Sequence, residues 1–199
     1  MPSDVRAELI EGIVYMPSPA RFPHPKAQEN AVAWIWTYRQ STPGTESGDN
    51  ATVILGKNCE PQPDVLLMIS PDNGGSATVN QNGYVEGPPE LIVEIASSTE
   101  AYDLHSKKRD YEKHGVQEYV VIALRQKKAY WFSREGEKYV DLPAGEDGIY
   151  RSHAFPGLWL DPQAVLEDNG SRLMKVLQQG LASDEHAEFV QRLAATKQP

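Results

Sequence analysis

The chain has 199 residues, of which 40% are hydrophobic and 24% are charged. These fractions are typical of a globular protein with one core of ordinary size, and they exclude a disordered or fibrous chain. The formal net charge of −9 argues against sequence-independent adhesion to nucleic acid, because such adhesion depends on lysine and arginine at the phosphates. Any contact with nucleic acid must therefore be local.

The only cysteine is Cys59, so the chain cannot form an internal disulfide bond. The first residues, MPSDVRAELIEGIVYMPSP, lack the apolar segment of an export signal. No stretch approaches the roughly 20 apolar residues of a membrane-spanning helix. We therefore expect a cytoplasmic protein that has no contact with a membrane.

The first half of the chain predicts a hairpin, a helix and three strands. Alternating apolar residues in AELIEGIVYMPS indicate a hairpin closed by Gly12, and helical spacing in HPKAQENAVAWIWTYRQ indicates the first helix. STPGTESGDN has the composition of a loop, and residues 70–89 predict a second, longer loop. The predicted strands are ATVIL, DVLLMIS and ELIVEIA.

The second half predicts a helix, three strands and two terminal helices. The helix is AYDLHSKKRDYEKHG, with Asp103 as its N-cap and Gly115 at its C-terminal end. The strands are EYVVIAL, AYWFS and KYVDL, and the terminal helices are SRLMKVLQQG and SDEHAEFVQRLAATK. Four tryptophans fall in apolar segments and are expected in the core: Trp34, Trp36, Trp131 and Trp159.

After the first hairpin the order is helix, three strands, helix, strand. With a Pro-Asp pair before one strand and a glutamate inside another, this order resembles the core of the PD-(D/E)XK nuclease superfamily, the restriction-endonuclease-like fold. Nearly the whole chain resembles the Uma family, a large group of proteins that are described as endonucleases and whose biological role is undefined. The segments that carry this resemblance are AELIEGIVYMPSP, QPDVLL, GPPELIVEIASS, YDLHSKKRDYEKHGVQEYVV and FPGLWLD.

The resemblance implies a fold of the α/β (α+β) class, with a mixed β-sheet flanked by helices and C-terminal helices added. We expect residues 1–168 to form the restriction-endonuclease-like domain and residues 169–199 to form a helical appendage. Nucleases of this fold often pair to cut two strands, so a homodimer is also expected. The apolar segment AYWFS, or the terminal helix with Phe189, Val190 and Leu193, could form the shared surface.

Two acids interrupt predicted strands. Asp64 follows Pro63 directly before an apolar run, and Glu94 lies within LIVEIA, on the strand face shared by Ile92 and Ala96. The resemblance implies that Asp64 and Glu94 are catalytic and bind Mg²⁺ or Mn²⁺, hard ions that take oxygen ligands and assist phosphodiester hydrolysis. Plainer explanations stay open: Asp64 can be an ordinary turn residue, and Glu94 can face solvent or pair with a lysine for structure alone.

The superfamily's lysine usually lies two positions after the second acid, where this chain has Ala96. The resemblance instead places the catalytic lysine at Lys107, in the predicted helix. Its charge could hold the attacking water or stabilise the phosphate, although runs of basic residues such as this one are usually solvated faces. Lys108 is rotated by about 100° from Lys107, so the two cannot enter one site. The sequence predicts that Lys107→Ala abolishes cleavage and leaves the fold and metal binding intact.

Three further residues are candidates for the site. Glu8 matches the glutamate of the family's opening motif, and an exposed strand acid is the alternative. Gln62 could bind a water or a phosphate, or it could be an ordinary hydrogen-bonding loop residue. His24 could cap the first helix or contact the substrate.

Two functions remain open on this basis. The first is a metal-dependent nuclease that hydrolyses phosphodiester bonds of nucleic acid, with DNA as the expected substrate. The second is a catalytically weakened module that binds nucleic acid or acts as an accessory on the same fold. The acidic net charge and Ala96 favour the second function.

Overall fold

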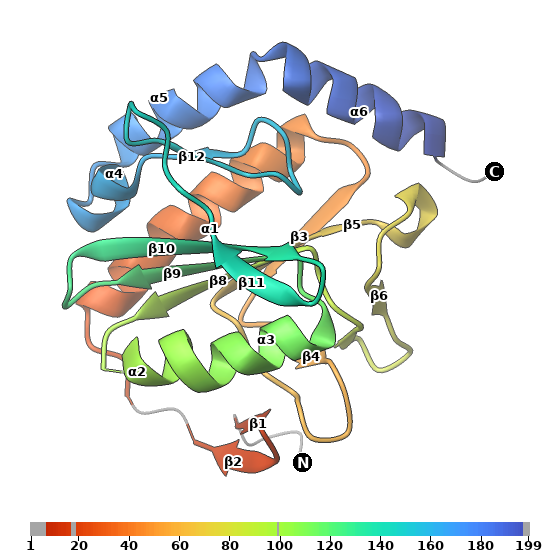
Figure 1. Cartoon of the computed structure of the whole chain (residues 1–199), viewed down its shortest axis with the longest axis vertical. Coiled ribbons are helices and arrows are strands. Elements are labelled where there is room, and N and C mark those ends of the chain that lie inside the picture. Colours follow the sequence, from red (N-terminus) through yellow and green to blue (C-terminus); the bar gives the residue numbers. More distant parts are fainter. Residues whose placement is uncertain (1–6, 17–18, 99, 197–199) are drawn as a thin grey trace.

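The computed structural model describes residues 7–16, 19–98 and 100–196. Within these ranges a six-stranded mixed sheet forms the centre, with the strand order β11-β10-β9-β8-β5-β3 (Figure 1). β8 and β9 are parallel, whereas the other neighbours are antiparallel. Its strands are β3 (Thr45–Asp49), β5 (Val65–Ile69), β8 (Leu91–Ala96), β9 (Glu118–Ala123), β10 (Lys128–Glu135) and β11 (Lys138–Asp141). The mixed sheet predicted from the sequence is confirmed.

Helices cover both sides of this sheet, and Figure 1 shows α1, α5 and α6 on one side and α2 and α3 on the other. The first side carries α1 (Pro23–Ser41), α4 (Pro162–Leu166), α5 (Gly170–Leu181) and α6 (Asp184–Thr196). The second side carries α2 (Glu100–Tyr102), the π-helical segment η2 (Asp103–Lys107) and α3 (Lys108–His114). The predicted arrangement of a sheet flanked by helices is therefore confirmed.

Strand alternation divides the core into two parts. Leu91, Val93 and Ile95 belong to the core beneath α1, whereas Ile92 and Ala96 belong to the core beneath α3. Glu94 has the same parity as Ile92 and Ala96, so its side chain projects towards α3, as the sequence predicts.

The C-terminal helices pack on the core beneath α1. Leu173 and Leu177 of α5 and Phe189 and Leu193 of α6 are buried there. Of the three residues that suggested a dimer surface on the terminal helix, Phe189 and Leu193 therefore face the chain's own core, and Val190 is half-buried. Trp131 and Phe132 of the AYWFS segment are buried in the same way, at 2% and 5% exposed. The domain boundary at residue 168 stays a prediction. The helices α5 and α6, which follow this boundary, share a hydrophobic core with the residues before it.

Several short strands complete the fold. The hairpin of β1 (Glu8–Ile10) and β2 (Ile13–Tyr15) is closed by Glu11 and Gly12, whose positive φ angles of 50° and 77° suit a two-residue turn. β4 (Val53–Ile54), β6 (Thr78–Val79) and β7 (Val85–Glu86) form a small sheet, and β12 (Tyr150–Arg151) pairs with β13 (Trp159–Leu160). The predicted long loop therefore contains β6, β7 and the 3₁₀ turn η1 (Pro71–Asn73).

Two sequence predictions are wrong within this fold. The segment TESGD, expected in a loop, forms β3, since an edge strand pairs with one neighbour and tolerates polar residues. Trp36, expected in the core, is 54% exposed because it lies on the outer face of α1. Trp34 and Trp131 are buried as predicted, and Trp159 is half-buried. No helix in the described ranges is both long and apolar enough to span a bilayer.

Candidate active site

Asp64 and Glu94 lie on neighbouring strands. Val65 pairs with Val93 across the antiparallel strands β5 and β8, so Asp64, directly before β5, comes opposite Glu94. The amide of Ile95 donates a hydrogen bond of 2.7 Å to Asp64 Oδ2, which orients this carboxylate. Asp64 and Glu94 are 8% and 4% exposed, so neither acid is an ordinary solvent-facing residue.

Lys107 reaches Glu94 from the helical side of the sheet. Its Nζ lies 2.9 Å from Glu94 Oε1 and 2.8 Å from Glu8 Oε1, and Asp103 Oδ1 is 3.9 Å away. Lys107 is only 4% exposed, so the ammonium group is enclosed by these three carboxylates. The helix therefore delivers a lysine to the strand end although Ala96 occupies the superfamily's usual position.

The π-helical segment η2 determines which side chains enter the cluster. Asp103 and Lys107 begin and end this segment, and both are buried on the same side. π-Helical turns are rare and occur frequently at functional sites. The helical region begins at Glu100, so the predicted N-cap role of Asp103 is wrong. Lys108 turns away, with its Nζ 3.5 Å from the centre of the Phe132 ring.

Two tyrosines belong to the cluster: the sequence places Tyr111 on the helix face of Lys107 without indicating its contact with Glu94, and it gives no sign of Tyr102. The Tyr111 hydroxyl donates a 2.9 Å hydrogen bond to Glu94 Oε1, the oxygen that Lys107 also contacts. The Tyr102 hydroxyl is buried without a hydrogen-bond partner in the described part of the chain, and its ring centre lies 5.8 Å from Lys107 Nζ. The four-residue spacing from Lys107 places Tyr111 on the same helix face, as the sequence predicts. No comparable signal marks Tyr102.

Burial and charge shift the pKa values of the central pair. Burial raises the pKa of Glu94 well above its usual range; the Lys107 charge opposes this shift, and the neighbouring carboxylates reinforce it. Burial alone would lower the pKa of Lys107, but the charge of Glu94, followed by those of Glu8 and Asp103, raises it overall. Lys107 is therefore protonated at neutral pH. When Glu94 is ionised, one ammonium group faces four carboxylates, so the ionised cluster favours an additional cation.

The donor set fits a hard divalent ion. Among the described residues, no donor bonds to Asp64 Oδ1 or to Glu94 Oε2, although their partner oxygens are engaged. Carboxylate oxygens are the ligands that Mg²⁺ and Mn²⁺ prefer, whereas Zn²⁺ favours nitrogen and sulfur. The residues present therefore fit Mg²⁺ or Mn²⁺.

The three additional candidates adjoin this cluster. Glu8 Oε1 accepts a 2.8 Å hydrogen bond from the amide of Gln62, and Gln62 Nε2 donates to Thr52 Oγ1 at 3.0 Å. His24 Nε2 lies 3.4 Å from Asp64 Oδ2. His24 lies in the first turn of α1, where Phe22 is the N-cap, so the structure favours contact with Asp64 over capping.

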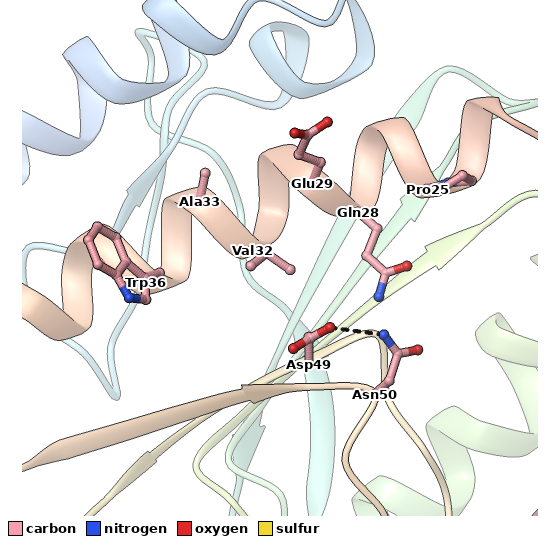
Figure 2. A pocket seen from close by; sticks show the side chains of 8 residues that line it. All are labelled: Pro25, Gln28, Glu29, Val32, Ala33, Trp36, Asp49 and Asn50. Atoms are coloured by element: carbon pink, nitrogen blue, oxygen red, sulfur yellow. Dashed lines mark hydrogen bonds between the residues drawn. The ribbon is translucent and has the colours of Figure 1, made fainter. Parts of the chain in front are cut away.

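A shallow groove runs along α1, between this helix and the residues Asp49 and Asn50 (Figure 2). Gln28 Nε2 and the backbone N–H of Asn50 both donate to the backbone carbonyl of Asp64, at 3.2 and 3.3 Å. From this end the groove continues past Val32 to the exposed ring of Trp36, with a cavity volume of about 440 Å³. The groove therefore has an exposed aromatic side chain at one end and, at the other, two residues that contact the backbone of Asp64.

Residues 1–163 match the model of the Uma2 family, described as "Putative restriction endonuclease". The chain belongs to the Uma2 family. The resemblance recognised from five short segments is thereby confirmed. Among proteins with curated descriptions, none matches this Uma2 protein in sequence.

A similar solved structure is that of "a putative nuclease belonging to DUF820 from Anabaena variabilis ATCC 29413". It aligns with this Uma2 protein at a TM-score of 0.55 and 15% sequence identity, covering 80% of this chain and 90% of that chain. At this identity the likeness shows the fold alone. Family membership supports a nuclease-like function.

Proposed function

We propose that this Uma2 protein is a metal-dependent nuclease that hydrolyses phosphodiester bonds of nucleic acid, with DNA as the expected substrate. The main support for this proposal is that Asp64, Glu94 and the ammonium group of Lys107 lie together in one buried cluster. Such a combination of carboxylates and a cation suits the stabilisation of charge during phosphoryl transfer.

Asp64 and Glu94 would hold Mg²⁺ or Mn²⁺ through the carboxylate oxygens that carry no hydrogen bond. When bound, such an ion supplies positive charge that polarises the phosphate and activates water. The Ile95 amide and the Tyr111 hydroxyl fix the orientation of the two carboxylates through their other oxygens. This fixed orientation reduces the reorganisation needed when substrate binds.

Lys107 acts as a cation and a hydrogen-bond donor. Because its pKa is raised, the ammonium group keeps its proton at neutral pH and cannot serve as a general base. It can donate to a phosphate oxygen and stabilise the negative charge that develops there. Glu8 contributes by pairing with Lys107 and by accepting a hydrogen bond from the backbone amide of Gln62, so that it fixes the position of the ammonium group beside Glu94.

The groove along α1 would bind the bases of the nucleic-acid strand near the cut. Glu29 and Asp49 line the groove and would repel phosphates, whereas Trp36 offers an exposed ring on which a base can stack. Gln28 and Trp36 are eight positions apart on one helix, which corresponds to about 12 Å. A strand of a few nucleotides can therefore span the groove from Trp36 to Gln28, the residue that contacts the Asp64 carbonyl.

The alternative function is a catalytically weakened module that binds nucleic acid on the same fold. The acidic net charge and the pairing of Lys107 with acids of the same chain favour it. A homodimer and a cytoplasmic location also belong to the proposal. Because Phe189 and Leu193 are buried, a dimer would have to use another surface, and light scattering at micromolar concentration tests its existence.

Titration calorimetry with Mn²⁺ tests the enzyme proposal. We expect the wild-type protein to bind Mn²⁺, Asp64→Ala to lose this binding, and Asp72→Ala, which changes an exposed acid outside the cluster, to retain it. Cleavage of single-stranded and duplex DNA in the presence of Mn²⁺ should follow the same order. Absence of Mn²⁺ binding to the wild-type protein would reject the enzyme and favour the binding module.

A further inference from the structure

A second group of metal-ligating side chains lies outside the candidate active site. Cys59, Asp110 and His114 each offer one ligand atom, and these atoms all lie within 4.8 Å of one another. Cys59 and Asp110 are 1% and 4% exposed, and His114 is half-buried. Asp110 and His114 lie one turn apart on α3, whereas Cys59 comes from the loop that follows β4. The group therefore joins two segments that are distant in the sequence.

The tautomer of His114 suits metal binding. Its Nδ1 lies 2.8 Å from the carbonyl oxygen of Asp110. A carbonyl oxygen only accepts hydrogen bonds, so Nδ1 carries a proton, and in the neutral ring Nε2 then has the free lone pair. Histidines that bind metals commonly donate the other ring N–H to a carbonyl or carboxylate in this way.

Gly56 leaves space at the metal-binding side of this ring. A Cβ atom built at Gly56 would lie 3.2 Å from His114 Nε2, which is a tight contact. Gly56 and Cys59 exchange two backbone hydrogen bonds of 3.2 Å, so the loop holds Cys59 beside the glycine. His114 Nε2 therefore faces the loop that carries the thiol.

Asp110 is fixed by a third segment. Its Oδ2 accepts a 2.7 Å hydrogen bond from the amide of Glu11, in the turn between β1 and β2. Burial and then the Asp110 charge raise the pKa of the Cys59 thiol; its hydrogen bond to Asp110 and the Glu60 charge add to the shift, and the Lys113 charge opposes it. Without a metal ion the thiol therefore keeps its proton, and the group is a hydrogen-bonded cluster. Metal binding would have to release this proton.

We propose that Cys59, Asp110 and His114 bind a transition-metal ion of the Zn²⁺ class, with water at a fourth position. A thiolate, a carboxylate and a neutral imidazole form a donor set suited to tetrahedral Zn²⁺ or Co²⁺ and poorly suited to Mg²⁺. The thiolate and the carboxylate together balance the charge of a divalent ion. This centre is separate from the Asp64 and Glu94 pair and selects a different kind of ion.

Such an ion would tie the loop at Cys59 to α3. The same helical region carries Lys107 and Tyr111 into the candidate active site. The ion would therefore stabilise the helix that supports the site, without contacting substrate. This inference stands whether or not the Uma2 protein cleaves nucleic acid.

Titration of the metal-free protein with Co²⁺ tests the proposal, since a Co²⁺–thiolate bond produces a charge-transfer absorption band. We expect the band in the wild-type protein, its displacement by Zn²⁺ and its persistence in excess Mg²⁺. Cys59→Ser should lose the band, and His114→Ala should bind Co²⁺ at least about tenfold more weakly. Asp64→Ala and His105→Ala, the second an exposed histidine of η2, should keep it.

Gly56→Ala is a second test of the site, needed because the ligand variants Cys59→Ser and His114→Ala could lose Co²⁺ binding through misfolding. It keeps all three ligands but crowds His114 Nε2, so Co²⁺ binding should weaken by about tenfold or more in a protein with an unchanged circular dichroism spectrum. A wild-type protein without the band, or a band that survives in Cys59→Ser, would overturn the proposal. Loss of the band in Asp64→Ala would overturn it as well, because the ion would then belong to the carboxylate cluster.

Discussion

Tyr111 and Lys107 both donate to the same oxygen of Glu94, at 2.9 Å each. Glu94 Oε1 is therefore occupied, and the carboxylate presents Oε2 as its available oxygen. The two donors lie four residues apart on consecutive helical segments, so the helix sets the orientation of an acid on the neighbouring strand.

Tyr111→Phe should reduce cleavage while leaving Mn²⁺ binding detectable. The substitution removes one of the two donors that orient Glu94 and should cost about 1–3 kcal/mol of stability, because a buried acceptor loses a hydrogen bond. Single-turnover cleavage and urea unfolding measure the two effects. Tyr139→Phe is the matched control, since its hydroxyl donates to the Val116 carbonyl away from the site. Equal loss of cleavage in both variants would contradict a specific role for Tyr111.

Lys107→Ala should abolish cleavage and also destabilise the fold. Removal of this buried cation leaves carboxylates without a counter-ion, and breaking a buried pair in this way costs about 3–5 kcal/mol. The expectation from sequence that the fold tolerates this change is therefore revised. Urea unfolding at neutral pH and a cleavage assay measure both effects.

Lys108→Ala is the control for Lys107→Ala. The Lys108 ammonium contacts the Phe132 ring, so its loss should cost about 0.5–1 kcal/mol and leave cleavage near that of the wild-type protein. If Lys108→Ala abolishes cleavage and Lys107→Ala does not, the catalytic lysine has been assigned wrongly.

Glu94→Gln should stabilise the metal-free protein at neutral pH. The folded state raises the pKa of Glu94, so it holds a proton that the unfolded state releases above a pKa of about 4.5. Ionisable Glu94 therefore lowers the free energy of unfolding as pH rises from about 4.5 towards its folded pKa. In the presence of a chelator, Glu94→Gln and the wild-type protein should have the same urea unfolding midpoint at or below pH 4.5. At pH 7 the midpoint of Glu94→Gln should be higher.

Addition of Mn²⁺ should reverse this order at pH 7. An ion that binds the folded wild-type protein stabilises it by mass action, whereas Glu94→Gln lacks one of the two ligands. Glu8 and Asp103 remain as partners of Lys107 in the variant, so the cation is not left alone. A variant that is less stable than the wild-type protein in chelator at pH 7 would refute the raised pKa.

Trp36→Ala should weaken binding of single-stranded DNA without changing the fold. Stacking of a base on an aromatic side chain contributes about 1–3 kcal/mol, which corresponds to a loss of roughly five- to 150-fold in affinity. Fluorescence anisotropy with Ca²⁺ in place of Mg²⁺ measures this affinity. Tyr84→Ala removes an exposed aromatic side chain elsewhere and should bind as the wild-type protein does. Equal affinity of Trp36→Ala and the wild-type protein would remove the groove from the proposal.

The sequence predicts the site residues that interrupt the apolar pattern of a strand. Asp64 and Glu94 stand out because strands favour apolar residues at such positions, and Ala96 directs attention to Lys107. The prediction of Asp103 as a helix N-cap is wrong. Its residue type and position suit a cap, and the π-helical segment that buries it has no clear sequence signal. Tyr102 enters the cluster through tertiary packing.

The fold shows the same division between local and tertiary information. Apolar periodicity predicts β5, β8 and α1, since their buried residues repeat with the strand or helix period. β3 is polar and becomes a strand only because β5 offers it a pairing edge. The approach of Cys59 to His114 likewise depends on how the loop after β4 meets α3, which no spacing in the sequence reveals.

The hairpin of β1 and β2 supplies Glu8 to Lys107, and its turn is held to α3 by the Glu11 amide and by Arg109. A wall of the buried cluster is thus built from one of the first elements of the chain. Figure 1 shows α6 at the opposite end of the molecule from this hairpin. A truncation that removes this hairpin would therefore open the buried cluster and leave Lys107 with two of its three carboxylate partners.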